Sequence, residues 1–206
     1  MSVKLIWSTP NGEELVAYMA RVSNPDNQDN KDTAPKLLKY LMKHKHWSPF
    51  EMVNVCMEIN TTRDIARQIL RHRSFSFQEF SQRYAEVIDW AAGEVRMQDD
   101  KNRQNSLPTQ DRELRRWWDE QQVATWKLAT NAYKAAIGMG IAKEVARKVL
   151  PEGLTMSRMY MNGTLRSWLH YVDIRCDEST QKEHREIAEQ CKVVLSSLYP
   201  NLFERS

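Results

Sequence analysis

The chain has 206 residues, a length typical of one domain, and we expect a single domain over residues 1–206. Its 30 lysine and arginine residues exceed its 27 aspartate and glutamate residues by a net charge of +3, too little for a surface that binds nucleic acid throughout. We therefore expect no nucleic-acid partner. Hydrophobic residues make up 41% of the chain and charged residues 28%, which is typical of a globular protein rather than a disordered one.

No apolar run reaches the roughly 18 residues that span a bilayer, and the amino terminus lacks the features of a secretory signal. We expect no membrane contact and a cytoplasmic location. The three cysteines are widely spaced and form no Cys-x-x-Cys pair. This spacing argues against a zinc ribbon and does not support a disulfide framework, so we expect no metal site.

Apolar residues at helical spacing predict helices over residues 13–22 and 35–44. Residues 50–59 then alternate between two faces, which is typical of a strand with one polar face. The threonines at 61–62 are good helix caps and predict a helix that ends near His72. The first part of the chain therefore combines three helices with one strand.

Residues 74–84 mix aromatic and polar side chains without helical period, and we expect them to be extended or irregular. The polar residues 90–109 predict a mobile loop. A long amphipathic helix is expected over residues 111–137, ended by Gly138 and Gly140. Its expected buried residues are Leu114, Trp117, Trp118, Leu128, Ala132 and Tyr133.

The last part of the chain predicts a short helix over 141–150, a strand over 154–161 and a turn at Asn162–Gly163. Thr164 is expected to cap the next helix, and a final helix covers roughly residues 180–198. The strands do not alternate regularly with helices, and no Gly-x-Gly-x-x-Gly is present. We predict an α+β fold with a small antiparallel-type sheet flanked by several helices.

The segment Arg71–Arg83, RHRSFSFQEFSQR, gathers guanidinium groups among phenylalanines. Guanidinium forks match phosphate oxygens and also stack on flat rings, so the segment indicates a site for a nucleotide or a nucleotide-like cofactor. Glu79 could accept hydrogen bonds from a ribose or neutralise the arginines. Basic residues at a helix end can also merely complement its dipole, but that explanation leaves the following polar groups unexplained.

The pattern RHRxxSxxExSxRY, filled here from Arg71 to Tyr84, resembles the signature of the flavin-dependent thymidylate synthases, which methylate deoxyuridylate. Gln78 stands where that family usually has asparagine. The segments HWSPFE at 46–51 and ARKVLP at 146–151 are also similar to family segments. Arg67–Gln68 resembles the family's RQ pair one turn before the signature. Asn162, Arg166, His170 and Arg175 follow in the expected order, with a longer spacing than usual between Asn162 and Arg166.

The resemblance implies FAD as cofactor, NADPH as reductant, methylenetetrahydrofolate as carbon donor, and a homotetramer with active sites at subunit interfaces. It implies that deoxyuridylate (dUMP) contacts Gln68, Arg71, Glu79, Ser81, Gln82, Arg83, Arg147 and Arg175. It implies that FAD contacts Ser48, Arg71, His72, Arg73, Glu79, Asn162, Arg166 and His170. By the same resemblance, His46 lies beside the flavin or the folate path, and Arg175 faces the uracil edge. We expect Ser81 to donate a hydrogen bond to the substrate rather than to act as a nucleophile.

Two other functions remain open at this point. The arginines and phenylalanines could grip RNA or single-stranded DNA, or the chain could be a flavoprotein of different chemistry. Single residues have alternatives too. His170 could be a core histidine, Arg147 a dipole or ion-pair partner, and Arg175 an activator of the Cys176 thiol. The tryptophans at 117, 118 and 126 are expected to pack rather than to form an aromatic cage.

Overall fold

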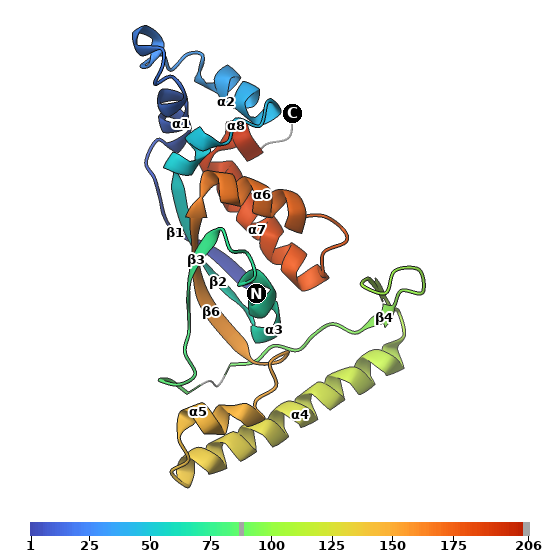
Figure 1. The fold of residues 1–206 in the computed structure, drawn as a ribbon. Coiled ribbons are helices and arrows are strands. Elements are labelled where there is room, and N and C mark those ends of the chain that lie inside the picture. Colours follow the sequence, from blue (N-terminus) through green and yellow to red (C-terminus); the bar gives the residue numbers. More distant parts are fainter. Residues whose placement is uncertain (87–88, 204–206) are drawn as a thin grey trace. The chain divides into compact units, whose positions relative to one another are not determined.

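The computed structural model describes residues 1–86 and 89–203. They form two compact units: the first comprises Met1 with residues 60–71 and 79–159, and the second comprises residues 2–59, 72–78 and the described part of 160–206. Four strands form a sheet in the order β1-β2-β6-β3 (Figure 1). Their bounds are Ser2–Ser8 for β1, Asn54–Thr62 for β2, Phe75–Glu79 for β3 and Met156–Thr164 for β6. This small sheet with its accompanying helices confirms the predicted mixed fold class, although β1 was not predicted.

The second unit contains most of the shorter helices. They are α1 (Gly12–Ala20), α2 (Ala34–Lys43), α6 (Leu165–Arg175), α7 (Lys182–Leu198) and α8 (Pro200–Phe203), with short 3-10 turns at Pro25–Asn27 and Ser48–Met52. Figure 1 shows α6 and α7 side by side. Thr164 caps α6 as predicted, because its hydroxyl accepts the backbone N–H of Ser167 at 3.3 Å.

The core of the second unit forms around β2. Val55, Met57 and Ile59 are fully buried, as predicted for one face of the strand, but Cys56 on the face expected to be polar is buried too. The strand begins at Asn54 rather than at residue 50, because Pro49 lies in the first turn of the preceding 3-10 segment. Trp168 of α6 is also fully buried, and its indole N–H donates to the carbonyl of Val55 at 3.0 Å. This bond satisfies the one polar atom of a large core side chain.

The first unit is built on one long helix. Its elements are α3 (Arg63–Ile69), β4 (Arg96–Gln98), β5 (Ser106–Pro108), α4 (Arg112–Gly138), α5 (Lys143–Ala146) and a 3-10 turn at Arg147–Val149. α5 folds back beside the carboxyl end of α4 (Figure 1). The contact between them is a small core of Tyr133, Ala146 and Leu150, against which Phe80 and Ile137 pack.

The turn predicted at Asn162–Gly163 is wrong, because both residues lie inside β6. Side chains along β6 alternate between buried and exposed, as in a strand with one covered face. A Cβ on Gly163 would lie only 2.6 Å from Cε1 of the Phe75 ring. The glycine therefore allows an aromatic ring to pack closely against the strand and does not reverse the chain.

The mobile loop predicted over residues 90–109 is also wrong, because part of it forms an antiparallel hairpin of β4 and β5. Asp99 holds the hairpin turn by accepting the backbone N–H of Lys101 at 2.8 Å and the Asn105 amide at 2.8 Å. These hydrogen bonds lower the pKa of the Asp99 carboxyl. Gln122 of α4 is buried, and its side-chain amide bonds both the backbone N–H and the backbone carbonyl of Gly93.

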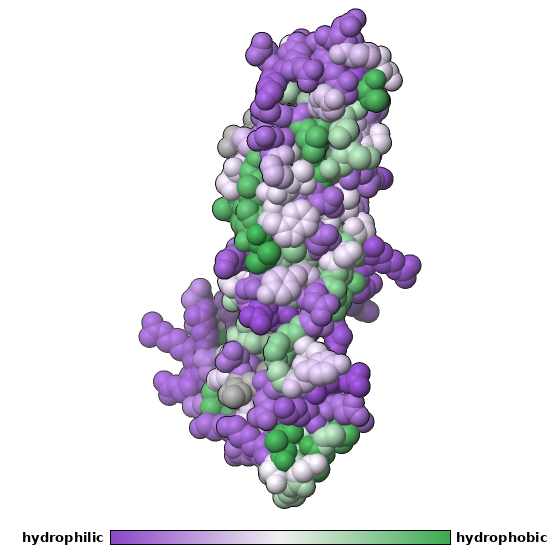
Figure 2. Space-filling model, turned by 90° about the vertical axis from the view of Figure 1, so that its left-hand side faces the viewer, coloured by the Kyte–Doolittle hydropathy of each residue, from purple (hydrophilic) through white to green (hydrophobic). Residues whose placement is uncertain are grey.

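The burial predicted along α4 is mostly wrong: of the six residues, Tyr133 is buried and Leu114 half-buried, whereas Trp117, Trp118, Leu128 and Ala132 are exposed. Trp126 and Tyr133 are buried, and Trp126 stacks on Trp90 with ring centroids 5.8 Å apart. Trp117 is 53% exposed and Leu128 75% exposed, so the helix presents apolar side chains on its outer face. Figure 2 shows further exposed apolar side chains at its lower end, over the turn between α4 and α5. None of the described helices is both long and apolar enough to cross a membrane.

Candidate functional site

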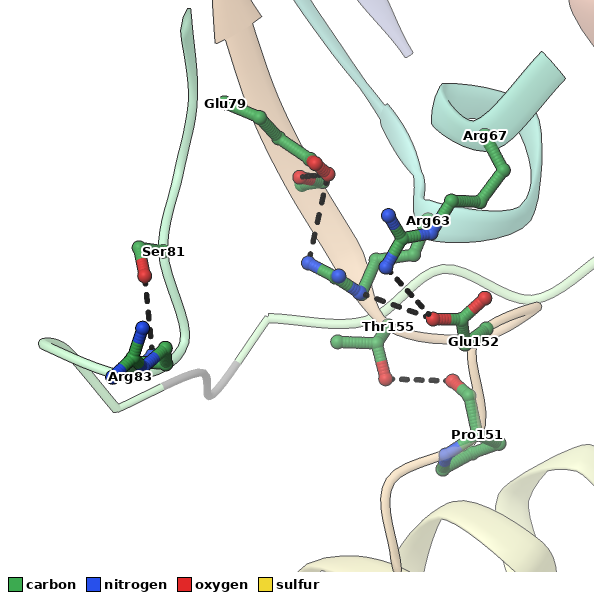
Figure 3. A network of polar contacts seen from close by, with 9 residues as sticks. Arg63, Arg67, Glu79, Ser81, Arg83, Pro151, Glu152 and Thr155 are labelled. Carbon is green, nitrogen blue, oxygen red and sulfur yellow. Dashed lines mark hydrogen bonds and ion pairs between the residues drawn. The ribbon is translucent and has the colours of Figure 1, made fainter. Parts of the chain in front are cut away.

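The signature segment runs from the end of α3 through β3. α3 ends at Ile69, earlier than predicted, and Arg71 and Arg73 follow with exposed side chains. Glu79, the last residue of β3, is half-buried and its carboxylate points toward Arg63 (Figure 3). The exposed guanidinium groups are therefore accessible to a ligand, while the carboxylate is held by protein contacts.

The Glu79 carboxylate belongs to a polar network of the first unit (Figure 3). Ser157, buried on β6, donates its hydroxyl to Glu79 Oε1 at 2.7 Å. Arg63, buried at the start of α3, places a guanidinium nitrogen 3.6 Å from the same oxygen. The contacts seen around Glu79 thus come from residues outside the signature, which the sequence patterns did not single out.

Glu152 extends this network toward α3. Its Oε1 lies 3.7 Å from Arg63 Nε and 3.3 Å from a terminal nitrogen of Arg67. Gln68, the neighbour of Arg67 in the predicted pair, is half-buried on α3. One face of α3 therefore combines two guanidinium groups with a carboxylate from the segment that leads into β6.

Ser81, Gln82 and Arg83 follow Glu79 directly. Ser81 Oγ accepts the backbone N–H of Arg83 at 3.3 Å, and the Arg83 side chain pairs with Glu144 at 3.2 Å. The Gln82 side chain is only 4% exposed, and its amide nitrogen has no hydrogen-bond partner in the structure. Because an unpaired buried donor is costly, this amide points to a ligand that completes it.

Arg175 and His72 meet in the second unit. Arg175 Nε donates to His72 Nε2 at 2.9 Å, and the His72 ring lies edge-on to Tyr171 with centroids 5.0 Å apart. Tyr171 and His184 are both fully buried, with 3.2 Å between the hydroxyl and the ring nitrogen. Burial lowers the pKa of His184 from 6.5 to about 3, helped by the positive charge of Arg175 and by the nearby His72 ring. Burial raises the pKa of Tyr171 well above 10, so Arg175 has neutral neighbours on this side.

A surface cavity of about 1240 Å³ lies in the second unit and is bordered by α6. Arg166 and His170, one turn apart on α6, line it together with Trp47 and Glu51. Arg166 pairs with Glu51, which fixes its guanidinium at the wall of the cavity. The volume exceeds the 300–1,000 Å³ typical of small-ligand sites, so a large cofactor can be accommodated.

The predicted residues fall into two sets. Most dUMP residues are in the first unit: Gln68, Arg71, Glu79, Ser81, Gln82, Arg83 and Arg147. Most FAD residues are in the second: Ser48, His72, Arg73, Asn162, Arg166 and His170. His170 is exposed, which excludes the core-histidine alternative. His46 is exposed beside the rings of Tyr40 and His44. Of the second set, Arg166 and His170 line the same cavity beside α6.

Several residues of these networks were missed from the sequence. Arg63 had one available signal, since an arginine in the first turn of a helix opposes the macrodipole and therefore needs a specific partner. Glu51 lies in a segment already noted, but only the structure shows its pairing with Arg166. His184 carried no signal, because nothing in its surroundings along the chain distinguishes it from a surface histidine.

Comparison with known proteins gives consistent results. Residues 4–201 match the family model described as "Thymidylate synthase complementing protein". The chain is 50% identical over 190 residues to a flavin-dependent thymidylate synthase of Synechocystis sp., covering 92% of this chain and 87% of that protein. It is 47% identical over 210 residues to a probable flavin-dependent thymidylate synthase of Paramecium bursaria Chlorella virus 1, covering 98% and 97%. A crystal structure of the UMP/dUMP methylase PolB from Streptomyces cacaoi, bound with 5-Br dUMP, matches with a TM-score of 0.86 at 26% identity, covering 98% and 93%.

Proposed function

The chain belongs to the thymidylate synthase complementing protein family, and from that premise we propose that it catalyses the reductive methylation of dUMP to dTMP. Methylenetetrahydrofolate donates the carbon and NADPH the reducing equivalents, with FAD as the cofactor. The observation that carries this proposal is the match over nearly the whole chain to relatives named as flavin-dependent thymidylate synthases. None of the relatives reported above is named as a nucleic-acid-binding protein.

The second unit has residues that fit FAD. The cavity beside α6 is large and lined by Arg166 and His170, a charged group and a ring that suit a dinucleotide. Asn162 Oδ1, on β6, is buried and has no hydrogen-bond partner in the structure, as expected of an atom that a ligand completes. Ser48, His72 and Arg73 are further proposed contacts. When bound, FAD supplies the redox chemistry that no side chain of the protein can perform.

The first unit supplies the proposed dUMP contacts. Arg71, which is exposed, is proposed to provide positive charge for the phosphate together with Arg83 and Arg147. The unpaired amide of Gln82 and the Glu79 carboxylate offer a donor and an acceptor for the sugar and the base. Binding energy from the phosphate and sugar then positions the uracil ring for reaction.

Arg175 is proposed to stabilise negative charge that develops on the uracil ring when its carbon 5 acts as a nucleophile. The guanidinium is held in place by His72 at 2.9 Å, so it needs little reorganisation during the reaction. Ser81 is proposed as a hydrogen-bond donor to the substrate, because its hydroxyl contacts a backbone N–H and no base in the described contacts. His46 is proposed to lie beside the flavin or the folate path.

This proposal is tested by tritium release from labelled dUMP with NADPH, FAD and methylenetetrahydrofolate. Purified protein should be yellow from bound flavin and should release tritium, and Arg175→Ala should keep FAD but lose at least tenfold of turnover, since a single charge-stabilising group is typically worth that much or more. Full activity in Arg175→Ala would remove this residue from its proposed role. A colourless protein that binds oligonucleotides in a salt-dependent manner would contradict the proposed function.

We also propose that the chain assembles as a homotetramer with its active sites at subunit interfaces. The exposed apolar side chains of α4, Trp117 and Leu128, support this proposal, because such residues are unfavourable in contact with water. Exposed Met139 and Ile141 extend the apolar surface around the turn after α4. In such an assembly, the dUMP residues and the FAD residues of one active site can come from different subunits.

A further inference from the structure

Arg63 is a buried cation that none of the proposed ligand contacts uses. Its side chain is 7% exposed, and its backbone N–H donates to the carbonyl of Thr155 at 2.9 Å. It is the first residue of α3, where a positive charge opposes the helix dipole. Burial of a guanidinium also removes it from water, so stability alone is a poor reason for an arginine at this position.

The contacts of Arg63 show what it does instead. Separate nitrogens of its fork face Glu79 at 3.6 Å and Glu152 at 3.7 Å (Figure 3). A lysine has a single ammonium group and cannot reach two carboxylates through separate donors in a fixed plane. Arg63 therefore links the end of β3 to the segment that enters β6.

Glu79 is held at one of its two oxygens. Ser157 donates to Oε1 at 2.7 Å, and the nearest Arg63 nitrogen faces the same atom. The hydroxyl and the guanidinium reach Oε1 from β6 and from α3, so the carboxylate is fixed in rotation. Neither of these two contacts involves Oε2, which keeps its capacity to accept a hydrogen bond.

We propose that Arg63 is a positioning residue of the nucleotide site, which holds Glu79 by Oε1 so that Oε2 accepts a hydroxyl of the nucleotide sugar. This inference rests on the proposed function, in which Glu79 contacts dUMP. The segments tied together by Arg63 also carry other proposed dUMP contacts, namely Gln68 on α3 and Ser81–Arg83 after β3. Displacement of Glu79 therefore weakens nucleotide binding without removing a group that touches the nucleotide.

The test is a double-mutant cycle on the FAD-loaded full chain, with the dissociation constant for dUMP measured by titration calorimetry. We expect Arg63→Lys and Glu79→Gln each to weaken dUMP binding by about tenfold or more. The double variant should bind dUMP as Glu79→Gln does, because Arg63 acts through Glu79. Ser157→Ala, which removes the other Oε1 contact without removing a charge, should show the same coupling to Glu79→Gln. If Arg63→Lys does not fold, the cycle of Ser157→Ala with Glu79→Gln still tests how Glu79 is held.

Arg96→Lys is the matched control. Arg96 is 13% exposed, pairs with Glu94 at 3.6 Å and donates to Ser106 at 2.8 Å, so it resembles Arg63 in burial and partners. Its replacement should lower the melting temperature and leave the dUMP dissociation constant unchanged. The inference is overturned if the losses of dUMP affinity multiply in the double variants. It is also overturned if Arg63→Lys and Ser157→Ala bind dUMP as the parent does. Either outcome leaves the proposed function standing. Parent-like binding in Glu79→Gln overturns the inference together with the proposed role of Glu79 in dUMP binding.

Discussion

At the residue scale, His184 shows how burial sets the charge state of a side chain near Arg175. It faces the Tyr171 hydroxyl, while His72 and Arg175 lie nearby. Protonation of His184 would place a further positive charge near the Arg175 guanidinium at a fully buried position. Burial therefore keeps His184 neutral, and the positive charge of the cluster stays at Arg175, where the proposed chemistry needs it.

The lowered pKa of His184 predicts a pH dependence of stability. Between pH 6.5 and about 3, the unfolded chain binds a proton at this residue that the folded chain does not bind. The free energy of unfolding therefore falls as the pH decreases from 6.5, by about 1.4 kcal/mol per pH unit from this group. Urea denaturation at several pH values should show a flatter dependence in His184→Gln.

Tyr171→Phe is the control for this measurement, because it removes the facing hydroxyl but leaves the histidine buried. It should keep the steep pH dependence of the parent. A His184→Gln variant whose stability falls as steeply as that of the parent over this pH range would show that another group is responsible.

At the element scale, strand β6 shows how the packing of one aromatic ring explains a glycine inside a strand. Phe75 of β3 packs edge-on against Trp168 of α6 with ring centroids 4.8 Å apart. The ring occupies the space above Gly163, so β6 can run through this point only without a side chain. The glycine therefore permits both the strand and the packing of the signature segment on α6.

Gly163→Ala should destabilise the protein by about 1–3 kcal/mol, because the added methyl group forces the Phe75 ring out of its packed position. Chemical denaturation at constant pH measures the change. Gly138→Ala is the matched control, since a Cβ there meets no atom within 4 Å, and it should not be destabilising. Equal stability of the parent and Gly163→Ala would show that the ring moves aside freely.

The long helix α4 is the feature that bears most on the whole molecule. Trp117 and Leu128 are exposed on a helix whose other face packs through Trp126 and Tyr133. A helix that is apolar on two faces needs a second partner, and another copy of the chain is the proposed one. The two sets of proposed site residues, one in each unit, are compatible with active sites that draw on more than one subunit.

Light scattering should give a mass of four times 24.3 kDa for the active protein. Leu128→Glu should shift the mass toward smaller species and reduce thymidylate formation, because a carboxylate is costly in an apolar interface. Glu120→Asp, an exposed change on the same helix that keeps the charge, should leave the mass unchanged. An active monomer contradicts the proposed assembly.

Most helices and the family could be predicted from the sequence, because they depend on local patterns. Apolar spacing predicted α1, α2, α4 and α7 to within a few residues, and the signature RHRxxSxxExSxRY led to a family that the comparisons confirm. The identity of the signature residues led to the proposed ligands, since guanidinium groups favour phosphate wherever the chain places them.

Other features were decided only by tertiary structure, because they depend on contacts between distant residues. The strand at Gly163 depends on a ring 88 positions earlier, and Gly93, which precedes the hairpin of β4 and β5, is anchored by Gln122 of α4. Glu79 pairs with Arg63 and Ser157, which come from two other elements. An arginine at the start of a helix signals the need for a partner, but no pattern along the chain identifies Glu79 as that partner. Local sequence determines propensity and chemical type, whereas burial and charge pairing arise only when separate segments pack together.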